Sequence, residues 1–577
     1  MEFSFIQGKK YLWKIPQTDS SAIQEIAHTH NMGFPLAAVL VSRGYVTKSD
    51  IHEFLFISSE VVQHTSLMKG AQVAVARIMQ AIERNEKILI FGDYDVDGIT
   101  SSSLMLMGLL ELGAQVNFYL PNRAKEGYGL SVKVVERAAA SKYSLIITVD
   151  NGITAFKPVI RAKELGIDVI ITDHHQPHDH LPEAYVIVDP HQKDCEYPFK
   201  YFAGVGVAFK LLQLLYAKAG KEISAKVIEL LLLGTIADVV PMLGENRFWV
   251  RHGLALLNQQ ESLALRVLKE NSSLFKPAIS STDIGFSITP QINALGRLDD
   301  PRQGVEFLIG TQEEQVRKIG KTLYELNQAR KDIEADIVLE IMRSVEKKEI
   351  DIEQENILLA GNAHWPTGVI GLVASRLVGL YGKPTLLFHI TKEGKAKGSC
   401  RSIPEFNMFE ALCENAHLLD TFGGHDVAAG FSLSLENLPA LKANLEKRVK
   451  EKLTAFDLQQ KISVDAGAQL SDFNTLFMQQ LAYFEPFGSK NPAPNFYIKN
   501  VVLVQKPKLL KDAHVKCVVF ADGVIKHAMF FKRPELFQLL VDQADKPFDM
   551  VVQVMHNYWN GKYTIELQGI DIALSKE

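Results

Sequence analysis

The sequence predicts an α/β protein whose largest domain is a doubly wound parallel sheet. Between residues 76 and 190, short apolar runs rich in Val and Ile alternate with amphipathic stretches of helical period. Strands buried on both faces give such apolar runs, and their alternation with helices favours parallel order with right-handed crossovers. The expected strands cover 88–91, 116–120, 145–149, 167–172 and 185–188, and the expected helices cover about 101–112, 131–141 and 154–165.

Acidic residues follow four of the five expected strands. They are Asp93, Asp95, Asp97, Asp150, Asp173 and Asp189. A single aspartate after a strand is often only a turn residue or a helix N-cap. Several of them indicate a site, because the carboxyl ends of parallel strands meet at one edge of the sheet, where ligands bind. Carboxylates gathered there repel one another, so the sequence predicts a bound cation, and oxygen ligands favour Mg²⁺ or Mn²⁺.

Two histidines and a more distant carboxylate extend this acidic cluster. His174 and His175 stand directly behind Asp173, and imidazoles beside carboxylates at a strand end suit Mn²⁺. Asp238 ends a nearly all-apolar helical stretch, where a charge without a partner is costly. A metal is the expected partner of Asp238, and a buried hydrogen-bonded cap is the alternative.

The chain is expected to divide into five parts. These are an N-terminal helical segment at 1–75, the sheet domain at 76–305, a connecting helix at 306–350, a second α/β domain at 351–455 and a small barrel of the OB type at 456–577. The connecting helix is predicted to begin with a capping box formed by Thr311 and Glu314.

Five or six short strand-like runs predict the C-terminal barrel. Basic and aromatic residues in it, among them Lys516, Arg533, Phe530 and Phe531, are candidates to hold and stack a single nucleic-acid strand. The alternative is that these aromatic residues belong to the barrel core, which is the commoner place for aromatic residues at alternate strand positions.

Composition excludes several classes of protein. The formal net charge of −5 argues against a generally basic nucleic-acid-binding coat, but leaves room for a local basic channel. The four cysteines form no CxxC pair, which speaks against a zinc knuckle or a disulfide framework and fits a reducing compartment. Because neither a signal peptide nor a membrane-spanning apolar run is apparent, we expect a cytoplasmic protein without a membrane partner.

In combination, the motifs of the chain resemble the DHH phosphoesterase superfamily, and within it the RecJ type of single-strand exonuclease. In the sheet domain these motifs are DYDVDG at 93–98, NR at 122–123, GYGL at 127–130, DNG at 150–152, DHH at 173–175, GVG at 204–206, ADVVP at 237–241 and NALGR at 293–297. A region similar to the DHHA1 domain adds GNAHWPTG at 361–368, GSCRS at 398–402 and GGH at 423–425.

The resemblance implies a two-metal cluster, and it assigns roles by motif position. The metal ligands would be Asp95, Asp97, Asp150, His174 and Asp238, with Asp93 and His175 supporting or catalytic. The residues that recognise the 5′-terminal phosphate of the substrate would be Arg123, Arg297, Ser399 and Arg401, and His425 would contact the scissile phosphate or the substrate backbone. Two adjacent divalent ions can activate water and stabilise both the attacking and the leaving oxygen of a phosphodiester.

The expected function is a 5′→3′ exonuclease that depends on two Mn²⁺ or Mg²⁺ ions and degrades single-stranded DNA to mononucleotides in DNA repair and recombination. Polarity and the preference for DNA come from the resemblance, whereas metal-dependent phosphoester hydrolysis follows from the residues. The family also implies a RecQ-type helicase and a single-strand-binding protein as partners.

Two alternatives to this function stay open. One is a DHH-type phosphodiesterase for short oligoribonucleotides or cyclic dinucleotides, which would use the same metals but would need neither the barrel nor the N-terminal segment. The other is a non-enzymatic replication scaffold of related fold, in which we would expect the motif acids to be lost, whereas this chain retains them.

Overall fold

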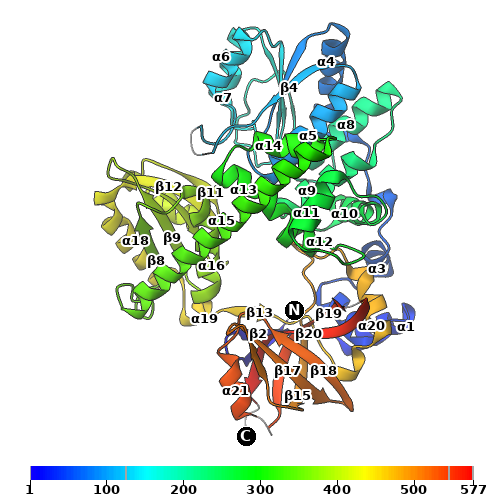
Figure 1. Cartoon of the computed structure of the whole chain (residues 1–577), viewed down its shortest axis with the longest axis vertical. Coiled ribbons are helices and arrows are strands. Elements are labelled where there is room, and N and C mark those ends of the chain that lie inside the picture. The colour runs from blue at the N-terminus through cyan, green and yellow to red at the C-terminus, as the bar shows by residue number, and fades with distance from the viewer. Residues whose placement is uncertain (1, 124–125, 544–545, 560, 575–577) are drawn as a thin grey trace. The chain divides into compact units, whose positions relative to one another are not determined.

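Figure 1 shows the computed structural model of the chain, which describes residues 2–123, 126–543, 546–559 and 561–574. Contacts between residues separate two units. The larger unit contains Ser59–Thr454 with Gly488–Lys490, and the smaller contains Met1–Ser58, Ala455–Phe487 and Asn491–Glu577. All metal-site and phosphate-site residues predicted from the sequence fall in the larger unit.

The larger unit contains the five-stranded parallel sheet that the sequence predicts. In spatial order its strands are β4 (Gln115–Tyr119), β3 (Lys87–Phe91), β5 (Leu145–Val149), β6 (Asp168–Thr172) and β7 (Val186–Val188). All neighbouring strands pair in parallel. The strand order reverses between β3 and β5, and such a switch point is where doubly wound sheets bind ligands.

Helices cover both faces of this sheet, as predicted. Ile88 and Ile90 of β3 face one hydrophobic core, and Leu89 and Phe91 face another. The helices on the first face are α4 (Ala71–Glu83), α5 (Val96–Glu111), α8 (Gly204–Ala219) and α9 (Ala225–Ala237). Those on the second face are α6 (Val132–Ala140) and α7 (Phe156–Glu164).

Helix α5 begins earlier than the sequence predicts. It starts at Val96 instead of near residue 101, because the Asp95 side chain accepts a hydrogen bond from the Gly98 amide at 3.1 Å and caps the helix. Asp97 therefore lies in the first helical turn and not in a loop.

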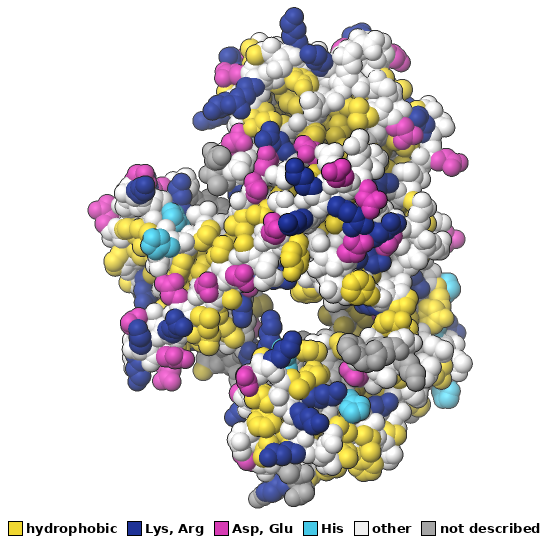
Figure 2. All heavy atoms as spheres, viewed as in Figure 1, with side chains coloured by type: hydrophobic (Ala, Val, Ile, Leu, Met, Phe, Trp, Pro, Cys, Tyr) yellow, Lys and Arg dark blue, Asp and Glu magenta, His cyan; other side chains and the backbone are white. Residues whose placement is uncertain are grey.

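A group of further helices continues the larger unit. They are α10 (Gly244–Leu257), α11 (Leu263–Asn271), α12 (Ser281–Asp283), the π-helical turn η3 (Ile284–Ile288), α13 (Thr289–Leu298) and α14 (Arg302–Ile309). The predicted connecting helix is α15 (Glu313–Glu346), 34 residues long. Its N-cap is Gln312 without a side-chain capping bond, so the predicted capping box is wrong. On the face that Figure 2 shows, basic and acidic side chains are interspersed along α15 and do not form a basic stripe.

The second α/β domain of the larger unit is built on a mixed sheet. In spatial order its strands are β11 (Thr421–His425), β12 (Ala428–Ser434), β10 (Lys395–Arg401), β9 (Thr385–Ile390) and β8 (Leu358–Asn362). Only β8 and β9 pair in parallel. Its helices are α16 (Thr367–Tyr381), α17 (Met408–Glu414) and α18 (Leu438–Lys452).

The smaller unit contains the predicted barrel. In spatial order its strands are β14 (Ala466–Gly467), β15 (Phe496–Leu503), β19 (Phe548–Trp559), β20 (Lys562–Leu574), β18 (Val524–Phe530), β17 (His514–Ala521) and β16 (Lys508–Leu510). An additional pairing of β15 with β17 closes the sheet on itself. The unit also contains α1 (Ser20–Thr29), α2 (Phe34–Ser42), α3 (Lys48–Leu55), α19 (Ala455–Leu458), α20 (Thr475–Leu481) and α21 (Leu536–Asp542).

The N-terminal segment differs from the helical segment that the sequence predicts. It opens with two strands, β1 (Phe3–Gln7) and β2 (Leu12–Pro16), and β2 pairs with β13 (Lys461–Ser463). Trp13 is fully buried, and its ring nitrogen donates to Asp571 of β20 at 3.0 Å. The N-terminal strands are thereby part of the smaller unit.

Two barrel residues that were candidates for nucleic-acid contact have structural roles instead. Phe530 is fully buried in the barrel core, as the alternative interpretation of the aromatic residues predicts. Arg533 is nearly buried and donates to the buried carboxylate of Asp571 at 3.0 Å. Phe531, by contrast, is exposed. Among the described residues, no helix is both long and apolar enough to cross a membrane.

Candidate metal centre

The loop after β3 and the start of α5 carry the first three carboxylates of the site. Asp97 is almost completely buried, and both of its carboxylate oxygens accept hydrogen bonds from backbone amides at the start of α8. Gly204 donates to Oδ2 at 2.6 Å and Val205 donates to Oδ1 at 2.8 Å. A Cβ on Gly204 would lie 2.4 Å from the Cβ of Asp150, so glycine is required for this close approach of α8.

Asp150 leaves the end of β5 with an unusual backbone. Its φ of 61° lies in the left-handed region, which is uncommon for residues other than glycine. The side-chain amide of Asn151 holds the turn by donating to the carbonyls of Phe91 at 3.2 Å and Val149 at 2.9 Å. Because these bonds join the ends of β3 and β5, Asp150 is held next to the acids that follow β3.

The pKa values of the two histidines after β6 are shifted in opposite directions. Nε2 of His174 lies 3.2 Å from Oδ1 of Asp150 and 3.7 Å from Oδ2 of Asp238. Burial and the neighbouring His175 lower the pKa of His174 to about 3, which leaves a neutral imidazole, the form that binds metals. Although burial opposes it, the hydrogen bond to Asp173 at 2.7 Å raises the pKa of His175 to about 9.

Asp173, the first residue of the DHH motif, anchors the two histidines. Its Oδ1 accepts hydrogen bonds from the backbone amides of His174 at 2.8 Å and His175 at 3.2 Å, as well as contacting the His175 ring. Its Oδ2 accepts from the Ile153 amide at 2.9 Å. Through these contacts Asp173 fixes the backbone of the two histidines and orients the His175 ring, and it belongs to none of the groups of potential metal ligands among the described residues.

Asp238 reaches the cluster from the end of α9, where it is the C-cap residue. The next residue, Val239, has a φ of 59°, which is strained for a β-branched side chain. Such strain persists only where the surrounding structure enforces it, and it is concentrated at functional sites.

Ligand atoms of seven predicted residues come together within 4.8 Å in three overlapping groups. The groups are Asp93 with Asp95 and Asp150, Asp97 with His174 and Asp238, and Asp150 with His174 and His175. The structure thus assembles every metal or catalytic candidate that the sequence predicts. Asp93 belongs to the same group of potential metal ligands as Asp95. Asp189 belongs to none of these groups, and its Oδ1 accepts from the His191 amide at 2.7 Å.

The electrostatics of the cluster favour a bound cation. Burial, followed by repulsion from neighbouring carboxylates, raises the pKa of Asp97 to about 7 and the pKa values of Asp93, Asp150 and Asp238 well above their usual range. Oδ1 of Asp93 is buried and has no hydrogen-bond partner among the described residues. Carboxylate oxygens together with a neutral imidazole fit Mn²⁺ or Mg²⁺.

A cluster of arginines lies near the acidic cluster in the larger unit. Arg297, at the end of α13, donates to the carbonyl of Gly368 in α16 at 2.8 Å. Burial and repulsion from Arg123 lower the pKa of Arg297 to about 10. The Arg123 guanidinium lies over the ring of Tyr94, 5.2 Å from its centre. Positive charges held this close favour an anionic ligand.

Three predicted phosphate-binding residues line one cavity of about 880 Å³. They are Arg123, Ser399 and Arg401, and a guanidinium nitrogen of Arg401 donates to Oγ of Ser399 at 2.9 Å. His425, the other candidate from the second domain, is exposed at the end of β11 and is not among the residues that line this cavity.

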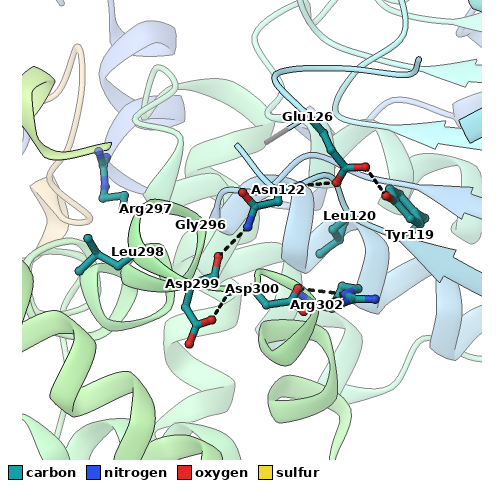
Figure 3. Close-up of a pocket in the computed structure, with 10 residues that line it drawn as sticks. All are labelled: Tyr119, Leu120, Asn122, Glu126, Gly296, Arg297, Leu298, Asp299, Asp300 and Arg302. Carbon is teal, nitrogen blue, oxygen red and sulfur yellow. Dashed lines mark hydrogen bonds and ion pairs between the residues drawn. The ribbon is translucent and has the colours of Figure 1, made fainter. Parts of the chain in front are cut away.

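A second cavity, of about 550 Å³, lies at the end of β4 and includes Arg297 in its wall (Figure 3). Glu126 accepts hydrogen bonds there from the Tyr119 hydroxyl at 2.5 Å and the Asn122 amide at 2.9 Å. Arg302 pairs with Asp300. Glu126 and Asp300 are thus engaged by neighbouring groups of the protein, and no grouping of acids and histidines like that of the metal centre occurs among the described residues that line this cavity.

Sequence reasoning assigned no role to two residues that organise the site. Tyr94 supports the Arg123 guanidinium, and the side-chain oxygen of Asn293 accepts a hydrogen bond from the Val96 amide at 3.2 Å. Tyr94 lies in the motif DYDVDG and Asn293 in the motif NALGR, and only this membership indicates a role for them in the sequence.

Comparison with known proteins agrees with this geometry. Sequence models match the DHH family, N-terminal domain, at residues 87–235, the DHHA1 domain at 354–451 and the RecJ OB domain at 464–571. The single-stranded-DNA-specific exonuclease RecJ of Bacillus subtilis is 35% identical over 571 residues, which cover 99% of this chain and 72% of that protein.

Solved structures of RecJ from Thermus thermophilus are similar to this chain. The complex with Mn²⁺ has a TM-score of 0.83 at 26% identity and covers 98% of this chain and 80% of that one. The complex with Mg²⁺ has a TM-score of 0.75 at 24% identity, covers 98% of this chain and 79% of that one, and supports the fold.

Proposed function

The chain belongs to the RecJ family, and on that premise we propose that it removes mononucleotides from the 5′ end of single-stranded DNA by metal-dependent hydrolysis. The observation that carries the proposal is the buried cluster of carboxylates and imidazoles at the switch point of the parallel sheet. The enzyme uses Mn²⁺ or Mg²⁺, in keeping with the cluster and with the ions in the Thermus structures.

We assign the metal ligands to the assembled cluster. The ligands are Asp95, Asp97, Asp150, His174 and Asp238, and Asp93 supports them. Bound divalent ions lower the pKa of water and stabilise the charge that develops on the phosphodiester oxygens. The protein holds Asp97 through two amides of α8 and His174 close to Asp150, so the ligand geometry is set before substrate binds.

His175 is assigned to proton movement. Its Nδ1 is fixed by Asp173 at 2.7 Å, which leaves Nε2 to face a ligand. An imidazole held in this way beside the carboxylate cluster is placed to carry a proton to the departing 3′ oxygen.

The arginines account for the selection of a 5′ end. Arg123, Arg297 and Arg401 with Ser399 are assigned to the terminal phosphate, and His425 to the substrate backbone. Asn293 contacts the acidic loop, and Arg297 follows four residues later on the same helix, about 6 Å along its axis. A spacing this short fits one nucleotide between the bound terminal phosphate and the phosphodiester that is cut, which gives a mononucleotide product.

The same proposal includes a role in DNA repair and recombination in the cytoplasm. It also includes two protein partners, a RecQ-type helicase and a single-strand-binding protein. They are supported by family membership. Co-purification of the tagged full chain with each partner tests the two interactions, and recovery of neither partner would contradict them.

The decisive experiment compares substrates. Single-stranded DNA, single-stranded RNA and a dinucleotide, each labelled at the 5′ end, are incubated with Mn²⁺ or with EDTA. We expect release of labelled mononucleotide from DNA with Mn²⁺ and no release with EDTA. Cleavage confined to the dinucleotide would favour a small-substrate phosphodiesterase, and cleavage of none of them would favour a non-enzymatic scaffold.

A further inference from the structure

A single helical segment runs past the acidic loop and the arginine cluster. Near its C-terminus, Arg297 belongs to the arginine cluster, and in its middle Asn293 contacts the Val96 amide of the acidic loop. Upstream, α13 is continuous with the π-helical turn η3. This turn presents Phe286 with 81% of its surface exposed, which is unusual for a large aromatic side chain.

The π-helical turn is fixed by a buried hydrogen-bond network. The Ser287 carbonyl accepts from the side-chain amide of Gln291 at 2.8 Å and from the Ser272 hydroxyl at 2.9 Å. Gln291 is 2% exposed, and its side-chain oxygen accepts from Asn271 at 3.0 Å. Single π-helical turns are rare and occur often at functional sites. The network therefore holds in place the backbone that presents Phe286.

The position of Phe286 relates it to the cleavage site. Phe286 precedes Asn293 by seven residues along this continuous helical segment, which separates their backbone positions by about 10 Å. A Cβ on the adjacent Gly285 would lie 3.4 Å from Ile236, two residues before Asp238. Along the segment, Phe286 thus lies on the opposite side of Asn293 from Arg297.

We propose that Phe286 is a stacking platform for a base of single-stranded DNA that lies beyond the first nucleotide on the 3′ side of the phosphodiester that is cut. The proposal rests on the proposed function, in which the 5′ phosphate lies at Arg297 and the cleaved bond at the acidic loop. A strand with that polarity continues toward Phe286. An exposed ring stacks on any base, so it adds affinity without sequence preference. Val239, beside Asp238 and 67% exposed, adds apolar surface near the same path.

The test measures how kcat/KM depends on substrate length. A 5′-phosphorylated dinucleotide ends before it reaches Phe286, whereas a hexanucleotide extends past it. Both are assayed with Mn²⁺ for the wild type and for Phe286→Ala, Phe286→Trp and Tyr185→Ala. Tyr185 is the matched control, because it is half exposed and precedes β7 at the amino edge of the sheet, opposite the metal centre.

We expect the ratio of kcat/KM for hexanucleotide to that for dinucleotide to fall about tenfold in Phe286→Ala. Phe286→Trp should restore the ratio, and Tyr185→Ala should keep the wild-type ratio. A wild-type ratio in Phe286→Ala, or a loss that Trp does not restore, would overturn the stacking role while the exonuclease assignment stands. If the wild type cleaves neither substrate, the proposed function itself fails and the stacking role fails with it.

Discussion

Replacing Gly204 by alanine should disable the metal centre although none of the ligand residues is replaced. The new Cβ would lie 2.4 Å from Cβ and 2.7 Å from Oδ1 of Asp150, whereas ordinary contacts begin near 3.4 Å. Asp150 or the start of α8 must therefore move by about 1 Å, a displacement that can cost on the order of 100-fold in rate when it affects a catalytic group. Movement of α8 would also weaken the 2.6 Å bond from the Gly204 amide to Asp97.

The assay for Gly204→Ala is the initial rate on 5′-phosphorylated single-stranded DNA with saturating Mn²⁺, with circular dichroism to verify folding. Gly379→Ala is the matched control, because Gly379 also lies in a helix and a Cβ there meets nothing within 4 Å. Alanine at that helical position should be neutral or stabilising by up to about 1 kcal/mol, with wild-type activity. A folded Gly204→Ala enzyme with a rate within about threefold of wild type would refute the reasoning.

Three further variants test other parts of the account. Asp150→Ala should abolish cleavage while single-stranded DNA still binds in EDTA, and full nuclease activity would remove Asp150 from the metal site. Arg401→Ala should reduce the preference for a 5′-phosphorylated over a 5′-hydroxyl end by about tenfold or more, since a charged hydrogen bond is lost, and an unchanged preference would exclude that role. Asp571→Ala removes the buried acceptor of Trp13 and of one guanidinium nitrogen of Arg533, which keeps its contacts with Glu535 and the Ile570 carbonyl, so the free energy of unfolding measured with urea should fall by about 2–4 kcal/mol, and a fall below about 1 kcal/mol would show that the Asp571 carboxylate is dispensable.

The parallel sheet could be predicted because each of its strands carries its own signal. A strand buried on both faces can be recognised from a few consecutive apolar residues, and the apolar residues of the helices between the strands recur with helical period. The strand β2 is short and is not a run of apolar residues. It pairs with β1 and with Lys461–Ser463, and a partner more than 400 residues away leaves no trace in the local pattern. The N-terminal segment was therefore expected to be helical throughout.

The candidate site was predictable to the extent that topology brings strand ends together. Asp150 and Asp97 belong to different strand ends, and parallel order alone places them at one edge. Asp238 could be predicted as a site residue because a charge at the end of an apolar helix is costly without a partner. The support of Arg123 by Tyr94 and the exposure of Phe286 depend on how helices and loops pack, which residue type and spacing do not encode. Arg533 was misassigned for the same reason, because its partner Asp571 is remote in sequence.

The central claim is that the acids and imidazoles at the sheet edge hold two divalent ions, and equilibrium dialysis against Mn²⁺ tests it most directly. We predict two Mn²⁺ ions per chain at saturation for the wild type, and loss of at least one ion in Asp150→Ala, because Asp150 belongs to two of the three ligand groups. One ion or none in the wild type, or two ions retained in Asp150→Ala, would contradict the account.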